Sequence, residues 1–167
     1  MFQPGDLVVY GTTGVCRVED ITTPSGAEAG KVYYLLKPLY QNGTVYTPVE
    51  RGKIPIRPIL TEIEAAALID AMPSVAPQTI SGTTMQAVSV QYQEALRQND
   101  CQSRLQLLKY IYEKQHPDTP GKQRVSSLDE RFRKQCEQLL YGELAVSLGI
   151  SMEEVPAYIE KRLKQKR

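Results

Sequence analysis

The sequence predicts an α+β fold, with a small N-terminal barrel or rolled β-sheet followed by an all-α C-terminal bundle of about five helices. In about the first fifty residues, short runs rich in β-branched and aromatic residues alternate with turn residues. From Thr61 onward, apolar residues recur at helical spacing instead. Two prolines within residues 52–58 favour extended backbone, as in a connector. We therefore expect two domains, residues 1–56 and residues 57–167.

Four strands are expected in the β domain. Residues 7–10 form a β-rich run, and residues 15–21 alternate apolar with polar side chains, the pattern of a half-buried strand. Two further runs cover residues 32–36 and 44–47. The Asn42-Gly43 pair between them predicts a tight hairpin turn with positive φ at both positions. Several short strands joined by tight turns indicate a small barrel or a rolled sheet.

Each expected helix has its own start signal. Capping residues precede the five helical segments at Thr61-x-x-Glu64, Thr83-x-x-Gln86, Asp100, Ser127-x-x-Glu130 and Ser151-x-x-Glu154. The first helix should end before Pro73, and Gly149 can end the fourth in a left-handed conformation. Pro156, one turn inside the fifth helix, should remove a backbone hydrogen bond and bend it. The fourth helix carries one apolar stripe, formed by Leu128, Phe132, Cys136, Leu139, Leu140 and Leu144.

The composition is typical of a globular protein, and the sequence argues against export. The chain has 167 residues, 41% of them hydrophobic and 23% charged, with a net charge of +1. Its three cysteines lie far apart without a CxxC pair, which favours reduced thiols. Neither a signal peptide nor a long apolar run is found, so we expect a cytoplasmic protein. The single histidine, His116, reads as a solvated loop residue.

No constellation typical of catalysis is found in the sequence. One histidine cannot supply the usual zinc motifs, and Gly-rich phosphate loops and nucleophile elbows are missing. The adjacent acids Asp129 and Glu130 point apart on a helix and read as first-turn acids that suit the helix dipole. We therefore expect no catalytic residues, no cofactor and no metal.

The N-terminal segment resembles a known family. The residues Phe2-x-x-Gly5-Asp6-x-Val8-Val9-Tyr10, followed by Gly14-Val15 and an alternating strand, are similar to the opening of the CarD family. The same module occurs in transcription-repair coupling factors. Near the other end, Leu140-Tyr141-Gly142-Glu143-Leu144-Ala145 resembles the family's Gly-Glu-Leu-Ala segment close to the end of a long helix.

The resemblance implies a non-catalytic bacterial transcription factor. It implies a Tudor-like β domain that binds the RNA polymerase β subunit, joined to a helical domain. In the family, the helical domain touches promoter DNA at the upstream edge of the bubble and stabilises the open complex.

The expected polymerase contact is the edge of the fourth strand. An unpaired edge can take up a strand of the partner through backbone hydrogen bonds. The residues that we assign to this contact are Thr44, Val45, Tyr46 and Thr47, with Pro48 ending the ladder. The alternative is that they only pack the domain's own core. Some family members carry arginines where this chain has Pro24 and Tyr46.

The expected DNA contact departs from the family pattern. The family's wedge is a tryptophan near the start of the second helix, and this chain has no tryptophan. Alignment through Tyr92 and Leu96 puts Val88 there, an apolar residue without a π face. The candidates for DNA contact are Val88, Gln91, Arg97, Arg131, Arg133 and Lys134. The alternative for each base, and for the basic run from Lys161 onward, is a solvated helix face.

Three functional hypotheses follow, the third of which is an enzyme of unrecognised type. The first is a polymerase-bound regulator of promoter opening that also contacts DNA. The second is a polymerase-binding adaptor that has lost DNA contact and acts through another protein. Monomer and dimer both stay open, because exposed strand edges permit domain swapping.

Overall fold

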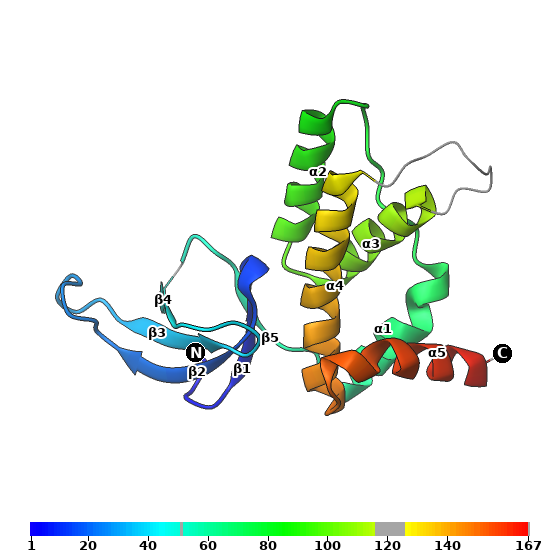
Figure 1. The fold of residues 1–167 in the computed structure, drawn as a ribbon. Coiled ribbons are helices and arrows are strands. Elements are labelled where there is room, and N and C mark those ends of the chain that lie inside the picture. The colour runs from blue at the N-terminus through cyan, green and yellow to red at the C-terminus, as the bar shows by residue number, and fades with distance from the viewer. Residues whose placement is uncertain (51, 116–125, 167) are drawn as a thin grey trace. The chain divides into compact units, whose positions relative to one another are not determined.

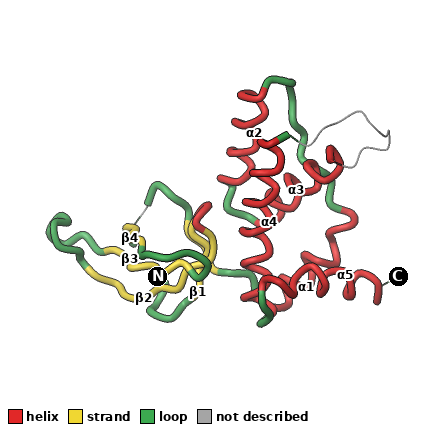
Figure 2. Tube along the Cα trace, in the orientation of Figure 1, coloured by secondary structure: helices red, strands yellow, loops and turns green. Residues whose placement is uncertain are grey.

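The computed structural model describes residues 1–50, 52–115 and 126–166. The chain forms two compact units, Met1–Ile59 and Leu60–Arg167. The first unit holds an antiparallel sheet and the second holds helices, so the predicted α+β class is confirmed (Figure 1, Figure 2). We call them the β unit and the helical unit.

The β unit contains one five-stranded antiparallel sheet, with strand order β4-β3-β2-β1-β5. Its strands are β1 Leu7–Tyr10, β2 Gly14–Thr22, β3 Tyr33–Pro38, β4 Val45–Pro48 and β5 Ile56–Pro58. The first four correspond to the predicted strands. Both β4 and β5 lie at the ends of this order, so the sheet has two edges.

Strand β5 was not predicted, because its prolines favoured a connector. It pairs with β1 through Tyr10↔Ile56 and Val8↔Pro58, and the Gly11 amide donates to the Pro55 carbonyl (3.1 Å). Proline is tolerated in an edge strand, where one side of the backbone needs no partner. The prediction of a connector considered that proline has no N–H to donate, but not that an edge strand needs hydrogen bonds on one side only.

The predicted two-residue hairpin at Asn42-Gly43 is wrong. Gly43 has a φ of +101°, whereas Asn42 is not among the residues with positive φ. Pairing of β3 with β4 ends at Leu36↔Val45. The Leu39 amide still donates to the Val15 carbonyl (3.0 Å). The chain after Leu36 thus stays bonded to β2 beyond the last pair with β4. A loop longer than two residues is therefore needed to connect β3 to β4.

The N-terminal motif residues hold the start of the chain to the sheet. The Gly5 amide donates to the Val18 carbonyl (2.7 Å), and the Val18 amide donates to the Asp6 carbonyl (2.8 Å). Gly5 has a φ of +95°, which glycine adopts without strain. The Phe2 amide donates to the Tyr34 hydroxyl (3.0 Å), and the two rings lie 5.8 Å apart. Phe2 thereby packs against the core of the sheet.

The helical unit contains the five predicted helices. They are α1 Glu62–Ala71, α2 Met85–Arg97, α3 Cys101–Gln115, α4 Ser127–Leu148 and α5 Val155–Gln165. Short 3₁₀ turns, Met72–Ser74 and Met152–Glu154, follow α1 and precede α5. The predicted stripe of α4 lies in one core with residues from all five helices; Leu128 is its partly buried member.

Several predicted caps are confirmed. Thr61 and Glu64 form a reciprocal capping box at the start of α1. The Asp100 carboxylate accepts from the Ser103 amide (2.6 Å) at the start of α3. Gly149 ends α4 with a φ of +70°, the left-handed conformation expected of glycine there.

Three predictions about helix starts are wrong. The cap of α2 is Thr84, not Thr83, and the cap of α4 is Ser126, not Ser127. In each case two identical residues stand side by side, and a Gln or Glu at the capping-box spacing favoured the wrong one. Pro156 lies in the first turn of α5, because Ser151 caps the preceding 3₁₀ turn. Amides in a first helical turn have no intrahelical acceptor, so the proline requires no bend.

Candidate functional site

Strand β4 forms one edge of the sheet. Among the residues described, it pairs with β3 alone, in the register Tyr34↔Thr47 and Leu35↔Tyr46. Just beyond the strand, the Val49 amide donates to the Val32 carbonyl (3.0 Å). This bond fixes which residues of β4 direct their backbone groups toward β3.

In an antiparallel ladder, backbone groups point alternately toward and away from the neighbouring strand. Since Val49 bonds toward β3, Thr47 and Val45 do so as well. The N–H and C=O of Tyr46 therefore point away from β3, toward the open side of β4. Pro48 shares that orientation but has no N–H, so a partner strand would lose one donor there.

The side chains of β4 divide between core and surface. Tyr46 is 49% exposed, whereas Thr47 is 2% exposed and Val45 packs against the core of the sheet. The alternative of packing within the domain therefore applies to Val45 and Thr47. Thr44 is exposed and Pro48 half-buried. A partner at this edge would meet the Tyr46 ring and the outward backbone groups.

The opposite edge is less suited to pairing. Strand β5 has only three residues, and neither Pro55 just before it nor Pro58 at its end can donate a backbone hydrogen bond. Prolines and short length are common means of protecting an edge from unwanted pairing. The two edges thus differ chemically, and β4 is the one better suited to pairing with another strand.

In the helical unit, Val88 lies in the core. It is 7% exposed and shares the buried face of α2 with Tyr92, Ala95 and Leu96. Its side chain is therefore not presented to DNA as a wedge. The nearest strongly exposed apolar residue of the same helix is Val90, which is 60% exposed.

Two other candidates for DNA contact have internal partners. The Gln91 amide accepts from the Ser81 N–H (2.8 Å) and donates to the Ser81 carbonyl (2.6 Å), which ties the preceding loop to α2. Arg133 forms ion pairs with both Glu130 and Glu137 on α4, the latter at 2.9 Å. The two carboxylates balance the positive charge of Arg133. They also raise its pKa above its usual value, with the hydrogen bond to Glu130 as the main cause.

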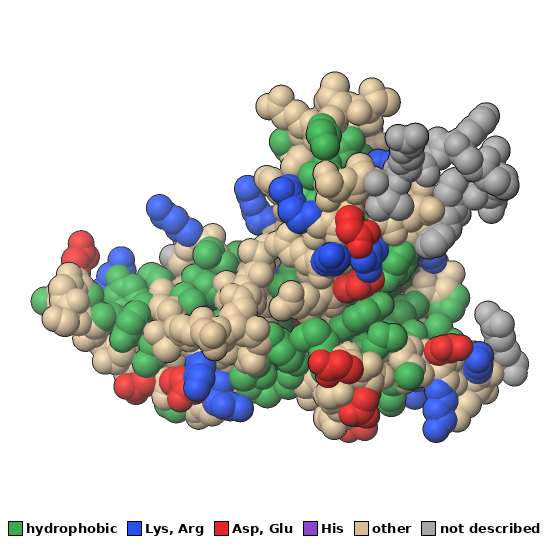
Figure 3. Space-filling model, in the orientation of Figure 1, with side chains coloured by type: hydrophobic (Ala, Val, Ile, Leu, Met, Phe, Trp, Pro, Cys, Tyr) green, Lys and Arg blue, Asp and Glu red, His purple; other side chains and the backbone are tan. Residues whose placement is uncertain are grey.

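The remaining three candidates are exposed. Arg97 pairs with Glu94 (3.3 Å) at a solvated site, Arg131 lies over the Phe132 ring at 5.1 Å, and Lys134 is exposed. Arg131 and Lys134 are three positions apart, so they share one side of α4. On the face seen in Figure 3, acidic and basic side chains are interspersed over the helical unit.

Sequence reasoning missed a buried polar network. The Asp129 carboxylate is 1% exposed, accepts from the Tyr92 hydroxyl (2.8 Å) and pairs with Lys114 (3.2 Å). Burial alone would raise the pKa of Asp129, but bonds from Tyr92, Ser126 and Lys114 outweigh it and hold that pKa below its usual value. Asp129 is thus a first-turn acid of α4, as predicted, and its buried hydrogen bonds also anchor the helix.

The Gly-Glu-Leu-Ala segment also has a structural role. Glu143, fully buried on α4, accepts from the Leu60 amide (2.9 Å) and from the Cys101 thiol (3.0 Å). Glu143 thereby links Leu60, the first residue of the helical unit, and the start of α3 to α4. These two hydrogen bonds give the glutamate of the Gly-Glu-Leu-Ala segment a structural role.

The described residues contain no cluster of His, Cys, Asp and Glu that could hold a metal. His116 lies outside the described residues. Burial raises the pKa of the Cys16 thiol to about 11 and that of Cys136 to about 12, so both favour the thiol form. Among the helices that the structure describes, none combines the length and apolar character needed to cross a bilayer.

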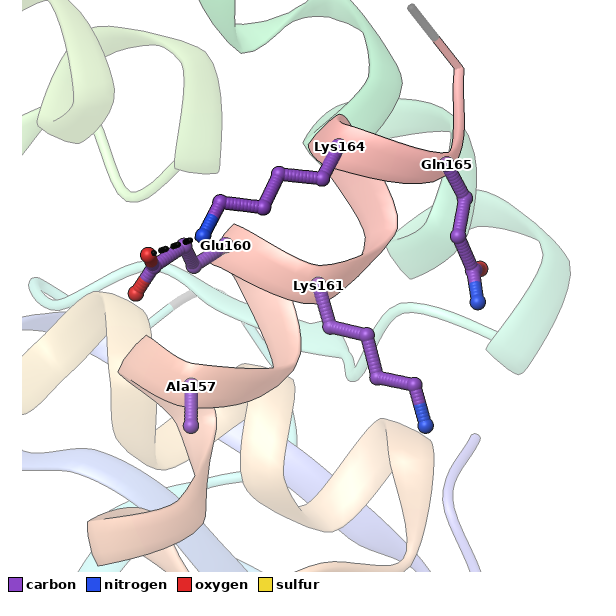
Figure 4. A pocket seen from close by; sticks show the side chains of 5 residues that line it. All are labelled: Ala157, Glu160, Lys161, Lys164 and Gln165. Carbon is purple, nitrogen blue, oxygen red and sulfur yellow. Dashed lines mark ion pairs between the residues drawn. The ribbon is translucent and has the colours of Figure 1, made fainter.

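A hollow on the outer surface of α5 is lined by one helix alone. Figure 4 shows its residues, Ala157, Glu160, Lys161, Lys164 and Gln165. Glu160 pairs with Lys164 (2.9 Å), and all five residues are exposed. The side chains of this part of the C-terminal basic run are therefore exposed on α5.

Comparison with known proteins identifies the β unit. Residues 2–60 match the family model of the CarD-like/TRCF RID domain. A search of curated proteins gave no match to the chain. The matched residues include all five strands and the open β4 edge. Residues 2–60 are thus a CarD-like RNA polymerase-interacting domain, and the chain is a transcription-related protein that carries it.

Proposed function

We propose that this protein is a non-catalytic bacterial transcription regulator, active in the cytoplasm, that docks on the β subunit of RNA polymerase through strand β4. The open β4 edge carries the proposal, because Tyr46 there directs its backbone groups and its ring outward. The family of the β unit supports the choice of polymerase as the partner. The helical unit would then modulate formation of the promoter open complex.

The first prediction concerns Tyr46. Tyr46→Ala should weaken binding to the isolated β-subunit lobe by roughly tenfold, because exposed aromatic anchors commonly contribute more than 1 kcal/mol. Tyr46→Pro should weaken it as well, by removing the outward N–H while leaving the ladder to β3 intact. Binding is measured by titration of the lobe against the full chain.

Tyr40→Ala is the matched control, since Tyr40 is 38% exposed in the same unit but lies outside β4. It should bind like the parent. If Tyr46→Ala and Tyr46→Pro both keep parental affinity while remaining folded, docking at β4 is refuted.

A second candidate function is an adaptor that binds polymerase without touching DNA. It is favoured by the internal engagement of Val88, Gln91 and Arg133. The regulator hypothesis is supported by Arg97, Arg131 and Lys134, which are exposed bases that could contact phosphates. The salt dependence of promoter binding distinguishes the two functions.

A further inference from the structure

The chain contains two asparagines, Asn42 and Asn99, and their surroundings are opposite. Asn42 lies in the loop between β3, which ends at Pro38, and β4, which begins at Val45. It is exposed, and no hydrogen bond among the described residues involves its side-chain amide. The amide of Asn42 can therefore rotate toward the backbone of the residue that follows it.

Gly43 follows Asn42 and leaves its own backbone nitrogen accessible. Apart from Gly43 and its two chain neighbours, no atom of the described residues lies within 4 Å of the point where a Cβ on Gly43 would stand. Glycine also has no side chain to hinder the approach of this nitrogen to the preceding residue. Joining the Asn42 Cγ to the Gly43 nitrogen closes a five-membered ring, and asparagine is among the thermolabile residues. The pair thus has both the reacting groups and the space for this ring closure.

Asn99 is held in place where Asn42 is not. It is 5% exposed, and its Oδ1 accepts a hydrogen bond from the Arg104 guanidinium (3.2 Å). The residue after it, Asp100, has a side chain, which accepts from the Ser103 amide at the start of α3. Rotation of the Asn99 amide would break a buried hydrogen bond, which is costly. Asn99 is therefore an internal control for the reaction at Asn42.

We propose that Asn42 is a site of spontaneous deamidation and that its isoaspartyl product weakens docking of strand β4. The Gly43 backbone nitrogen loses its proton and attacks the Asn42 Cγ. A bond from that nitrogen to Cγ forms, the bond from Cγ to the side-chain nitrogen breaks, and ammonia leaves. Water then opens the resulting succinimide at either carbonyl. Opening at Cγ gives aspartate, whereas opening at the main-chain carbonyl carbon leaves the chain running through Cγ as isoaspartate.

Isoaspartate changes the chain directly before the proposed contact. It adds one carbon to the main chain, a length of about 1.5 Å. The Gln41 side chain donates to the Thr13 carbonyl (3.4 Å) before the modified pair, and Val45 pairs with Leu36 after it. The extra length must therefore be absorbed between Gln41 and Val45, which displaces Thr44. Since Thr44 is the first residue assigned to the polymerase contact, this part of the inference rests on the proposed function.

The first experiment tests the reaction itself and does not depend on polymerase. The full chain is aged in warm, mildly alkaline buffer made with water enriched in heavy oxygen, because the Gly43 nitrogen must lose a proton. Peptide mass spectrometry should show loss of the Asn42 amide with uptake of heavy oxygen, and backbone fragmentation should identify isoaspartate there. Asn99 should stay intact. If Asn42 survives as long as Asn99 does, the site is refuted.

The second experiment measures the effect of the modification on docking. Aged parent, with its isoaspartate content known, should bind the isolated β-subunit lobe between about twofold and tenfold more weakly than fresh parent, the range expected for losing one hydrogen bond. Asn42→Gln is the control, because its longer side chain cannot close the same ring, and its affinity should not change on ageing.

The two proposals fail in different ways. Equal binding by fresh parent and by isoaspartyl-containing parent overturns the effect on docking. Equal binding by fresh parent and fresh Tyr46→Ala instead counts against docking at β4, and the mass data at Asn42 then still decide whether the reaction occurs.

Discussion

At the scale of single residues, two valines of α2 have opposite surroundings. Val88 is 7% exposed in the core, and Val90 is 60% exposed. We predict that Val88→Trp destabilises the protein by about 1–3 kcal/mol, since extra volume in a packed core forces its neighbours apart. Val90→Trp should stay within about 0.5 kcal/mol of the parent. Urea unfolding measures both, and equal stabilities would contradict the burial of Val88.

The burial of Val88 could have been inferred from the sequence. The alignment used Tyr92 and Leu96, and Val88 precedes Tyr92 by the same four positions that separate those two. Residues four apart share one face of a helix. Tyr92 and Leu96 face the core, so the aligned position was bound to face it too. The partners of Gln91 and Arg133, by contrast, depend on rotamers and loop paths that spacing does not encode.

At the scale of whole elements, the ion pairs of Asp70 join α1 to α5. The Arg162 guanidinium, and then Lys166, lower the pKa of Asp70 from its usual 3.8 to about 2. A carboxyl with a lowered folded-state pKa stabilises the fold above its unfolded-state pKa and loses that effect as pH falls through the folded-state value. The contribution of Asp70 should therefore disappear between about pH 4 and pH 2.

We predict that Asp70→Asn lowers the free energy of unfolding at pH 6 and that the difference from the parent shrinks as the pH falls to 2. Added salt should also reduce the difference, because the pairs are partly exposed. Denaturant titrations at several pH values measure this. Glu62→Gln, a change of an exposed acid on the same helix, is the control. A difference that is constant over this pH range would exclude the ion pairs as its cause.

Elements with a local signal were predicted, and those that depend on neighbours were not. Strands β1 to β4 and all five helices have their own periodicity and caps. Strand β5 has three residues beside two prolines and exists only because β1 offers a partner. The prediction of a two-residue hairpin was wrong for the same reason, because the hydrogen bond from the Leu39 amide to the Val15 carbonyl decides where the chain turns. The sequence analysis expected β4 to offer an edge, but only the strand order of the structure places it there.

At the scale of the whole molecule, the regulator and the adaptor differ in their effect on promoter binding by polymerase. Each phosphate contact on duplex DNA makes the negative slope of log K for promoter binding against the log of salt concentration steeper by about 0.9. If the helical unit touches DNA through Arg131 and Lys134, the protein should steepen this slope. The double variant Arg131→Ala/Lys134→Ala should then reduce it by about two, whereas Lys161→Ala on α5 should leave it unchanged.

The measurement is promoter binding by the polymerase complex at several salt concentrations, with and without the protein. Binding of the variant to polymerase alone must match that of the parent, so that any change reports DNA contact. A steeper slope that depends on Arg131 and Lys134 supports the regulator. An unchanged slope, with polymerase binding intact, would refute DNA contact by α4 and favour the adaptor, because a partner bound only through protein releases no counterions from DNA.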